Sequence, residues 1–363
     1  METRRIPGTV IAKRTTRVYS LHGIILQVTS DTSLPEQVLD AIFHYFGWYG
    51  PLLEPSPEVD IELVVVHTHQ EVPSLHTTCP IVEYNGVVFQ RGLQALSVTW
   101  EDTRLYVDVP AQKIWAYLPP DKWADVSQLT IEHLISLMHG VLVLVRKLGF
   151  FPLHAAAVAQ GEDAVLFCGP KGSGKTTMAY ALVQQGMRFL SDDSILLEPE
   201  DTTVYVRPLR RYFAFTTEDM QKLERVRAAF QIGARSKWYV DVSMLYEGQE
   251  AERAIPVVLI FPEIVQRERS RLLPLSSEEA MQRLIGQAGL LSLPPDLATK
   301  HLHVLSQLVR QVDAYSLEAG QDVYGHPDVL ESFIEPLLST STKHKCHDSG
   351  QIHTRQSGRM YRA

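Results

Sequence analysis

The sequence predicts an α/β protein in which a P-loop catalytic domain follows a smaller mixed α+β domain. The stretch VLFCGPKGSGKTT, at 165–177, matches the P-loop pattern G-x-x-x-x-G-K-[ST] between an apolar strand and a helix. Strands and helices alternate from Phe150 to about Leu338, which is typical of α/β domains, whereas the preceding residues have a mostly β pattern. With 363 residues, the chain is long enough for two domains.

Residues 1–125 are expected to form the mixed α+β domain. Three parts of it predict strands: VDIELVVVHT is a buried strand, SVTW and RLYVDV form a hairpin around EDT, and KIWAYL is a further strand. One helix, LPEQVLDAIFHYFG, ends at Gly47. Because this domain carries no chemical motif, we expect it to bind a peptide, by addition of a strand to its exposed strands.

Residues 126–149 are expected to connect the two domains. The segment SQLTIEHLISLMHGVLVLVRKLG predicts a long, largely buried helix that ends at Gly149. Its most apolar part, from Leu134 to Val145, is interrupted by His139 and is too short to cross a bilayer. No membrane span is therefore expected.

The catalytic domain is expected at 150–338. After the P-loop unit, the predicted strands are FLSDDSILLEP, TVYVRP, YFAFT, WYVDV, IPVVLIFPEIV and DAYSLEAG. A polar helix begins at Thr217, two helices cover Ser277–Ala288 and Pro295–Gln311, and HPDVLESFIEPLL is the closing helix. The tail at 339–363 is polar and without period, which predicts disorder.

The composition limits the classes of binding partner and the cellular compartment that we expect for this protein. The net charge of -8 gives no bulk basic field for nucleic acid, so no nucleic-acid partner is expected. Three scattered cysteines are too few for a disulfide framework. The basic N-terminus lacks the apolar segment of a signal peptide. A cytoplasmic location follows as the expectation.

The P-loop is expected to bind ATP together with Mg²⁺. Its glycines leave backbone N–H groups free to converge on phosphate oxygens, at a helix N-terminus whose dipole favours anions. Lys175 would reach the β/γ-phosphates, and the Thr176 hydroxyl would be a Mg²⁺ ligand. The residues expected to bind the nucleotide are Gly169, Pro170, Lys171, Gly172, Ser173, Gly174, Lys175, Thr176 and Thr177.

Two adjacent carboxylates are candidates for the chemistry of phosphoryl transfer. Asp192 and Asp193 end an apolar strand, at the sheet edge where P-loop folds gather their Mg²⁺ and nucleophile groups. One carboxylate would face Mg²⁺ and the other an incoming hydroxyl; a solvated turn is the alternative. His154, at the start of a run of small residues in FPLHAAAV, would bond a carboxylate, although a structural histidine fits the pattern equally well.

These three stretches together resemble a known family. The order LHAAAV, GPKGSGKTT, FLSDDSILLEP is similar to the C-terminal catalytic domain of HPr kinase/phosphorylase and its relatives, which include lasso-peptide precursor kinases. The resemblance covers about 150–338 and implies a phosphoenolpyruvate-carboxykinase-like nucleotide fold. It also implies that His154 supports the catalytic base and that the Asp192–Asp193 pair supplies the Mg²⁺ contact and the base. Of the two, we favour Asp193 as the base and Asp192 as the metal ligand.

Some residues depart from the HPr enzyme or fit two interpretations. No clear copy of its Arg-Gly-Leu-Gly loop is present, which favours the peptide-modifying relatives. Lys237 looks like the basic position before a strand in such kinases and would hold the transferring phosphoryl group, but a surface lysine fits equally well. Arg207, Arg210 and Arg211 form a basic cluster available to phosphate or an acidic peptide, and a solvated face is the favoured interpretation.

Three functions compete. The favoured one is a kinase that moves the γ-phosphoryl group of ATP to a Ser or Thr hydroxyl of a peptide or protein, with a ribosomally synthesised lasso-type precursor as the best candidate. The others are a P-loop NTPase switch and a nucleotide-binding module without turnover, and an HPr-type kinase/phosphorylase remains an alternative. No LSGGQ-type signature supports the switch. HPr-type enzymes form hexamers, so a homo-oligomer is a further expectation from the resemblance.

Overall fold

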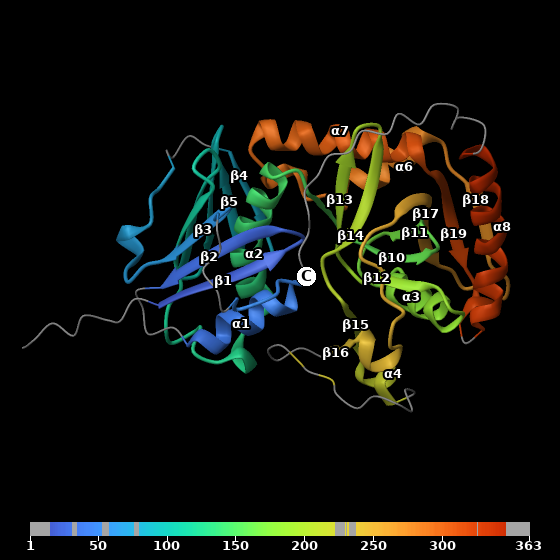
Figure 1. The fold of residues 1–363 in the computed structure, drawn as a ribbon, viewed down its shortest axis with the longest axis horizontal. Coiled ribbons are helices and arrows are strands. Elements are labelled where there is room, and N and C mark those ends of the chain that lie inside the picture. The colour runs from blue at the N-terminus through green and yellow to red at the C-terminus, as the bar shows by residue number, and fades with distance from the viewer. Residues whose placement is uncertain are drawn as a thin grey trace, which may run out of the picture.

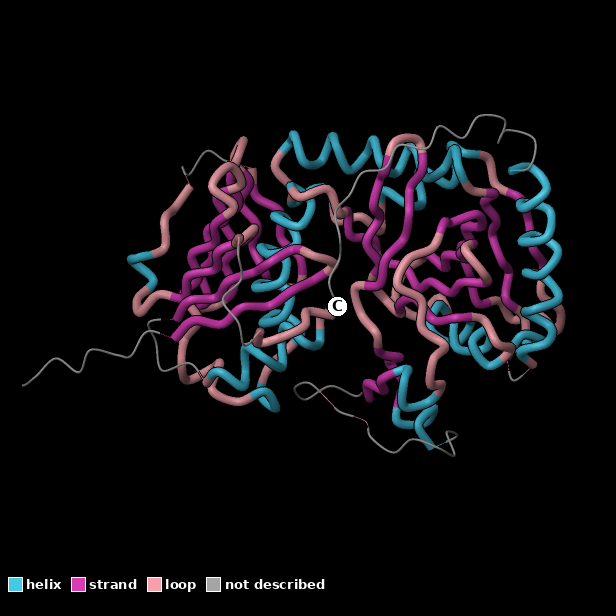
Figure 2. Tube along the Cα trace, viewed as in Figure 1, coloured by secondary structure: helices cyan, strands magenta, loops and turns pink. Residues whose placement is uncertain are grey.

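The computed structural model describes residues 15–30, 35–52, 58–75, 80–221, 229, 231, 237–324 and 326–345. Strands β1–β8 gather on one side of the molecule, and the strands from β9 onward gather on the other (Figure 1). Figure 2 shows the same two groups of strands in magenta, with helices around each. The mixed α/β class expected from the sequence is confirmed, with several mixed sheets.

The first sheet has eight strands among the described residues, in the order β1-β2-β3-β8-β7-β6-β5-β4. Neighbouring strands are antiparallel except for the parallel pairs β2–β3 and β3–β8. The strands are β1 (Thr15–Leu21), β2 (Ile24–Ser30), β3 (Ile61–Val65), β4 (Ile81–Tyr84), β5 (Val87–Arg91), β6 (Ala95–Trp100), β7 (Thr103–Asp108) and β8 (Lys113–Tyr117).

Two helices accompany this sheet, α1 (Glu36–Tyr45) and α2 (Ile131–Lys147). Alternate residues of β7 are buried, as the pleat of a one-sided strand requires. The helix α2 covers β6 and β7. At Gly140 it lies so close to the sheet that an added Cβ would be 3.2 Å from the Val107 Cγ2 atom. The predicted hairpin, the strand at 113–118 and both helices are confirmed, with ends shifted by a few residues.

The second group is built around a six-stranded sheet in the order β12-β10-β11-β17-β19-β18. Its centre, β11–β17–β19, is parallel. Both faces of β11 are buried: Val165 and Phe167 face one hydrophobic cluster, and Leu166 and Cys168 face the other. These strands are β10 (Ala155–Gln160), β11 (Asp163–Cys168), β12 (Arg188–Ser191), β17 (Ile255–Ile264), β18 (Arg271–Pro274) and β19 (Asp313–Ala319).

Two smaller sheets complete the strands, β14-β13-β9 and β15-β16. Their members are β9 (Phe151–Leu153), β13 (Ile195–Glu200), β14 (Thr203–Pro208), β15 (Tyr212–Thr216) and β16 (Lys237–Asp241). The helices are α3 (Lys175–Gln184), α4 (Thr217–Gln221), α5 (Val242–Leu245), α6 (Ser277–Ile285), α7 (Pro295–Gln311) and α8 (Pro327–Lys345). Short 3-10 turns lie at His69–Glu71, Val126–Gln128, Leu290–Ser292 and Gln321–Val323.

One predicted strand is wrong. The stretch FLSDDSILLEP, expected as one strand, forms two: β12 pairs in the six-stranded sheet and β13 in the three-stranded one. Asp193 lies between them with a φ of +74°, a left-handed conformation that turns the chain. Apolar residues on both sides of the aspartates conceal this break from a hydrophobicity pattern.

The closing helix is longer than expected. The sequence predicts a helix at 326–338, yet α8 continues to Lys345, seven residues into the segment expected as a disordered tail. Residues 346–363 of that tail lie outside the described residues. None of the described helices combines the length and the hydropathy that a membrane-spanning segment needs.

The two groups of strands share one hydrophobic core. A single cluster of buried side chains includes Leu26 and Ile42 from the first group and Leu153 and Leu196 from the second. Removal of residues 1–120 would therefore expose apolar surface of the remaining domain. Point substitutions therefore test the roles of the two groups of strands better than the removal of residues 1–120 would.

A buried histidine in this core gives a pH-dependent stability. His301 on α7 is fully buried; its Nδ1 atom lies 3.4 Å from the Arg146 Nε atom, which donates to it. Burial, with the positive charge of Arg146, lowers the pKa of His301 to about 3. The unfolded chain takes up a proton near its ordinary pKa, whereas the folded chain does not until about pH 3.

We expect the free energy of unfolding to fall as the pH drops below about 6.5, by about 1.4 kcal/mol per pH unit from this residue. The His301→Gln variant should lose that share of the slope between pH 6 and pH 4 in urea unfolding. His303→Gln is the matched control, since His303 lies on the same helix and is exposed. If the free energy of unfolding has the same slope against pH in wild type and His301→Gln, His301 is not the source of this pH dependence.

Candidate active site

The P-loop connects β11 to α3, as the sequence predicts. Gly172 and Gly174 have φ values of +86° and +95°, which L side chains rarely adopt. A Cβ on Gly174 would also lie 3.2 Å from the Tyr324 hydroxyl. Gly174 is the N-cap of α3 and provides no side-chain cap, so the first N–H groups of the helix are available to an anion.

Lys175 lies at the start of α3 and is 6% exposed. Its Nζ atom donates to the carbonyl oxygens of Gly169 (2.7 Å) and Pro170 (2.9 Å) in its own loop. Burial lowers the pKa of Lys175. The ammonium group is therefore held inside the loop that its motif assigns to phosphate, where a phosphate oxygen would replace these carbonyls.

Thr176 and Asp192 contact each other. The Thr176 hydroxyl donates to the Asp192 Oδ1 atom at 2.9 Å, and the Ala214 backbone N–H donates to Oδ2 at 3.1 Å. Asp192 is 1% exposed, and burial, with the negative charge of Asp193, raises its pKa to about 6. A cation would lower the cost of this buried negative charge.

Asp193 is the second carboxylate of the site, and it is held in a different way. The Arg210 Nη1 atom donates to Asp193 Oδ2 at 2.7 Å, and the His154 Nδ1 atom lies 3.3 Å from Oδ1. Burial alone would raise the pKa of Asp193, but the positive charges of Arg210, Lys175 and Lys237 hold it below its ordinary value. Asp193 is consequently ionised at neutral pH.

The backbone of Asp193 is strained. Its φ of +74° costs a non-glycine residue on the order of 1–3 kcal/mol, and such conformations persist where the surroundings over-determine them. Here the neighbouring Ser191 Oγ atom lies 2.5 Å from the Ser194 carbonyl oxygen and 2.7 Å from that of Arg210, so its one hydrogen is shared between them and braces the turn. The turn presents Asp193 Oδ2 to the charged Arg210 and Oδ1 to the ring of His154.

His154 lies between β9 and β10, opposite the same turn. Its Nδ1 atom is 2.8 Å from the Asp193 carbonyl oxygen, which accepts a hydrogen bond from the Nδ1–H tautomer. Burial lowers the pKa of His154, so that the ring is neutral near pH 7. The expected contact between His154 and a carboxylate is present, and His154 also fixes the backbone that carries it.

The structure separates the three arginines that the sequence groups as a solvated face. Arg207 bonds Glu198 at 2.8 Å, and Arg211 pairs with Glu252. Arg210 instead turns into the site, so the interpretation as a solvated face is wrong for this residue. A sequence signal existed: the strands β13 and β14 pair as a hairpin with Ile195 opposite Pro208, which places the residues just beyond its open end side by side.

Two buried hydroxyls lie at the loop: the sequence predicts Ser173 as a nucleotide-binding residue, whereas Tyr324 was missed. The Ser173 Oγ and Tyr324 hydroxyl atoms are buried without a hydrogen-bond partner among the described residues. Buried polar atoms of this kind are expensive unless a ligand or water pairs them. No sequence pattern around Tyr324 predicts its position, because the 3-10 turn Gln321–Val323 brings it to the loop from far along the chain. Lys237, the first residue of β16, is close enough for its charge to act on both aspartates.

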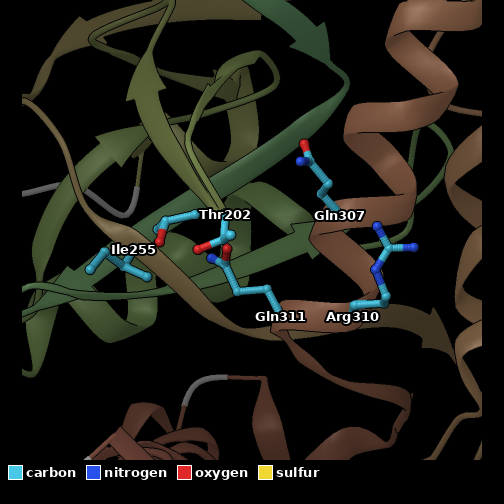
Figure 3. A pocket seen from close by; sticks show the side chains of 6 residues that line it. Thr202, Ile255, Gln307, Arg310 and Gln311 are labelled. Atoms are coloured by element: carbon cyan, nitrogen blue, oxygen red, sulfur yellow. The ribbon is translucent and has the colours of Figure 1, made fainter. Parts of the chain in front are cut away.

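A surface pocket lies elsewhere. It has a volume of about 520 Å³ and is lined by Thr202, Thr203, Ile255, Gln307, Arg310 and Gln311. In Figure 3 the three long polar side chains of α7 extend along its wall. None of the P-loop residues or the paired aspartates lines it. The Gln311 amide donates to the Val204 and Pro256 carbonyl oxygens, so this side chain fastens the hairpin to α7.

Within the described parts of the chain, no three His, Cys, Asp or Glu side chains form a group that would hold a metal ion by themselves. A nucleotide site differs in this respect, because Mg²⁺ there takes most of its ligands from phosphates and water. The structure brings together Thr176 and Asp192, the two residues expected from the sequence as Mg²⁺ ligands, with the Thr176 hydroxyl 2.9 Å from Asp192 Oδ1.

Comparison with known proteins assigns this chain to no family. Neither a family model nor a curated protein matches this sequence. Among solved structures, the chain is similar to the Hpr(Ser) kinase/phosphatase from Coxiella burnetii, with a TM-score of 0.30 and 12% sequence identity. The match covers 54% of this chain and 98% of that one. A similarity of this size carries no argument, so the function is inferred from the geometry of the site.

Proposed function

We propose that this protein is a kinase that transfers the γ-phosphoryl group of ATP to a Ser or Thr hydroxyl of a peptide or protein. One observation carries the proposal: the P-loop residues and an ionised carboxylate occupy one site. Thr176 bonds Asp192, and the next residue, Asp193, is held by Arg210 and His154. Such a carboxylate is what a kinase needs to accept the proton of its acceptor hydroxyl.

The residues present fit ATP with Mg²⁺. Among the described residues, the loop offers uncapped N–H groups at α3, an ammonium group whose bonds go to loop carbonyls, and a Ser173 hydroxyl without a partner. Thr176 and Asp192 would hold Mg²⁺, which when bound offsets the charge on the phosphate oxygens. The buried Asp192, with its raised pKa, is a group that a cation would stabilise.

The protein's own residues then divide the work of the transfer. Lys175 and the loop amides bind the β- and γ-phosphates and fix the direction of the γ-phosphorus. Asp193 accepts the hydroxyl proton as the acceptor oxygen bonds to phosphorus and the bond to the ADP oxygen breaks. His154 holds the Asp193 backbone through the hydrogen bond from Nδ1 and adds a neutral ring beside Oδ1.

The peptide substrate is the finer part of the proposal. The motif resemblance favours a ribosomally synthesised lasso-type precursor. The first sheet ends in the edge strand β4, where Ile81 and Tyr84 are 62% and 59% exposed, and an extended peptide would add a strand there. This edge supports the expectation that the N-terminal part of the chain binds the peptide.

The test is phosphorylation of a peptide by the full-length chain. We expect that incubation with ATP, Mg²⁺ and the precursor peptides encoded near its gene adds one phosphoryl group to one peptide, as seen in its intact mass. Replacing the modified Ser or Thr with Ala should abolish the gain. Hydrolysis that is fast and indifferent to every peptide, without any phosphopeptide, would instead indicate a switch NTPase.

A further inference from the structure

Arg210 is fastened to the turn that carries Asp193. Its backbone N–H donates to the Ser191 Oγ atom at 3.1 Å, and Ser191 donates to the Arg210 carbonyl oxygen at 2.7 Å. Its side chain, 14% exposed, donates from Nη1 to Asp193 Oδ2 at 2.7 Å. Both the backbone and the guanidinium group of Arg210 are thus directed at the catalytic turn.

Two aromatic rings at the C-terminal end of α1, in the N-terminal part of the chain, also contact this guanidinium group. Its central carbon lies 4.6 Å from the ring centroid of Tyr45 and 4.7 Å from that of Phe46. The two rings are 1% and 5% exposed. We call Tyr45 and Phe46 the aromatic clamp.

Close docking of α1 makes this clamp possible. Gly47 follows it with a φ of +77°, and a Cβ at this position would lie 2.1 Å from the Leu209 carbonyl oxygen. Only glycine allows such an approach to the residue before Arg210. The C-terminal end of α1 is therefore packed directly against the segment that carries Arg210.

The shape of the guanidinium group gives the clamp a consequence. Aromatic rings attract its flat faces, and its N–H groups point outward in the plane, where they meet a carboxylate at a fixed angle. The Tyr45 and Phe46 rings are 4.9 Å apart and inclined at 82°, so they pack together against one side of the guanidinium group and limit where it can lie. The N–H edge of the group meets Asp193, whose unusual backbone conformation needs support.

The adjacent arginine provides an internal comparison. Arg211 also lies over an aromatic ring, that of Tyr49, at 5.7 Å. Its charge partners are Glu250 and Glu252, and no contact joins it to Asp193 among the described residues. The two arginines thus share sequence context and an aromatic neighbour from the same segment but differ in their target.

We propose that Arg210 is a positioning residue for Asp193, and that the aromatic clamp makes the N-terminal part of the chain a component of the phosphoryl-transfer site. The inference rests on the proposed function, in which Asp193 is the base. In this inference the N-terminal part of the chain has a second role besides peptide binding. Its residues Tyr45 and Phe46 contact Arg210, which holds the base Asp193 in place.

The test measures kcat and the KM for ATP with the phosphorylated peptide as substrate. Arg210→Gln should lower kcat by roughly 10–100-fold, the loss of one charge-assisted pair, with the KM for ATP within about twofold. Phe46→Leu, which keeps the apolar volume, should lower kcat by roughly 3–10-fold. Arg210→Lys should recover part of the loss, since it restores charge without the planar edge.

The controls are Arg211→Gln and Tyr49→Leu, which should leave kcat within about twofold. Melting temperatures and ATP affinity report whether each variant is folded. The decisive comparison is a double-mutant cycle: in the Asp193→Asn background, Arg210→Gln should cause no further loss, because it acts through Asp193.

An additive loss in that cycle would overturn the inference, because Arg210 would then act on the nucleotide or acceptor directly. An unchanged kcat in folded Arg210→Gln would overturn it as well. A wild-type chain that phosphorylates no peptide would have a different meaning: it would overturn the proposed function, and the inference with it.

Discussion

Asp193→Asn is expected to lower peptide phosphorylation by roughly 10²–10⁴ while ATP binding remains largely intact, the usual contribution of a general base. The amide accepts no proton at neutral pH, yet it keeps the shape of the side chain and one oxygen for Arg210. In the proposed site, ATP is bound by the loop and α3, whose side chains the substitution leaves in place. Transfer rates with saturating peptide and ATP, together with ATP affinity by calorimetry, measure the two effects separately.

A matched control exists for this substitution. Asp201 also has a positive φ, of +52°, and lies exposed in the turn between β13 and β14. Asp201→Asn should leave transfer unchanged. Asp192→Asn should instead raise the Mg²⁺ concentration needed for half-maximal rate. If Asp192→Asn abolishes transfer at saturating Mg²⁺ and Asp193→Asn shifts the Mg²⁺ requirement, the two roles are exchanged.

The second large effect is expected at the P-loop. Lys175→Met should weaken ATP binding by roughly 10²-fold or more, because it removes charge-assisted hydrogen bonds to phosphate oxygens. The methionine retains the buried aliphatic stem, so the fold should persist. Burial already disfavours the ammonium form, as the lowered pKa of Lys175 indicates, so its loss should not destabilise the chain strongly.

Calorimetric titration with ATP and a melting curve without nucleotide test this prediction together. Lys300→Ala, an exposed lysine on α7, is the control and should bind ATP as the wild type does. Unchanged ATP affinity in a folded Lys175→Met variant would contradict the assignment of the loop.

The sequence predicted those parts of the site whose geometry is set locally. The spacing of Gly169, Gly174 and Lys175 specifies a tight loop before a helix, and the structure has that loop with Gly174 in the left-handed region. Similarly, α7 was predicted with its observed limits, since apolar residues recur along one face and a proline marks its start. Local chemistry was sufficient for these elements.

The sequence predicted that Asp192 and Asp193 end an apolar strand, but not the left-handed turn at Asp193. Its left-handed conformation interrupts what hydrophobicity presents as one strand, and aspartate only mildly favours that conformation. What holds the turn is the bracing by Ser191 and the bonds from His154 and Arg210. Ser191 lies two residues before Asp193, but His154 follows β9 and Arg210 follows β14, so no window of neighbouring residues contains all three.

Arg210 and its clamp show the same limit more strongly. The contacts of Arg210 with Tyr45 and Phe46 join residues that are far apart in the sequence. Their encounter depends on how α1 packs over the shared core, which a single sequence does not state. A hairpin prediction for 195–208 would have placed Arg210 near Asp193, but the aromatic side chains would still have been missed.

The most direct test of the account is the fate of the γ-phosphoryl group. Full-length protein, Mg²⁺ and ATP labelled at the γ-phosphate are incubated with the candidate peptides, and the label is divided between peptide and inorganic phosphate. The account predicts that most of the label reaches a Ser or Thr of one peptide, that little is released to water, and that Asp193→Asn removes the transfer. Label that appears only as inorganic phosphate, at a rate independent of peptide, would contradict a kinase.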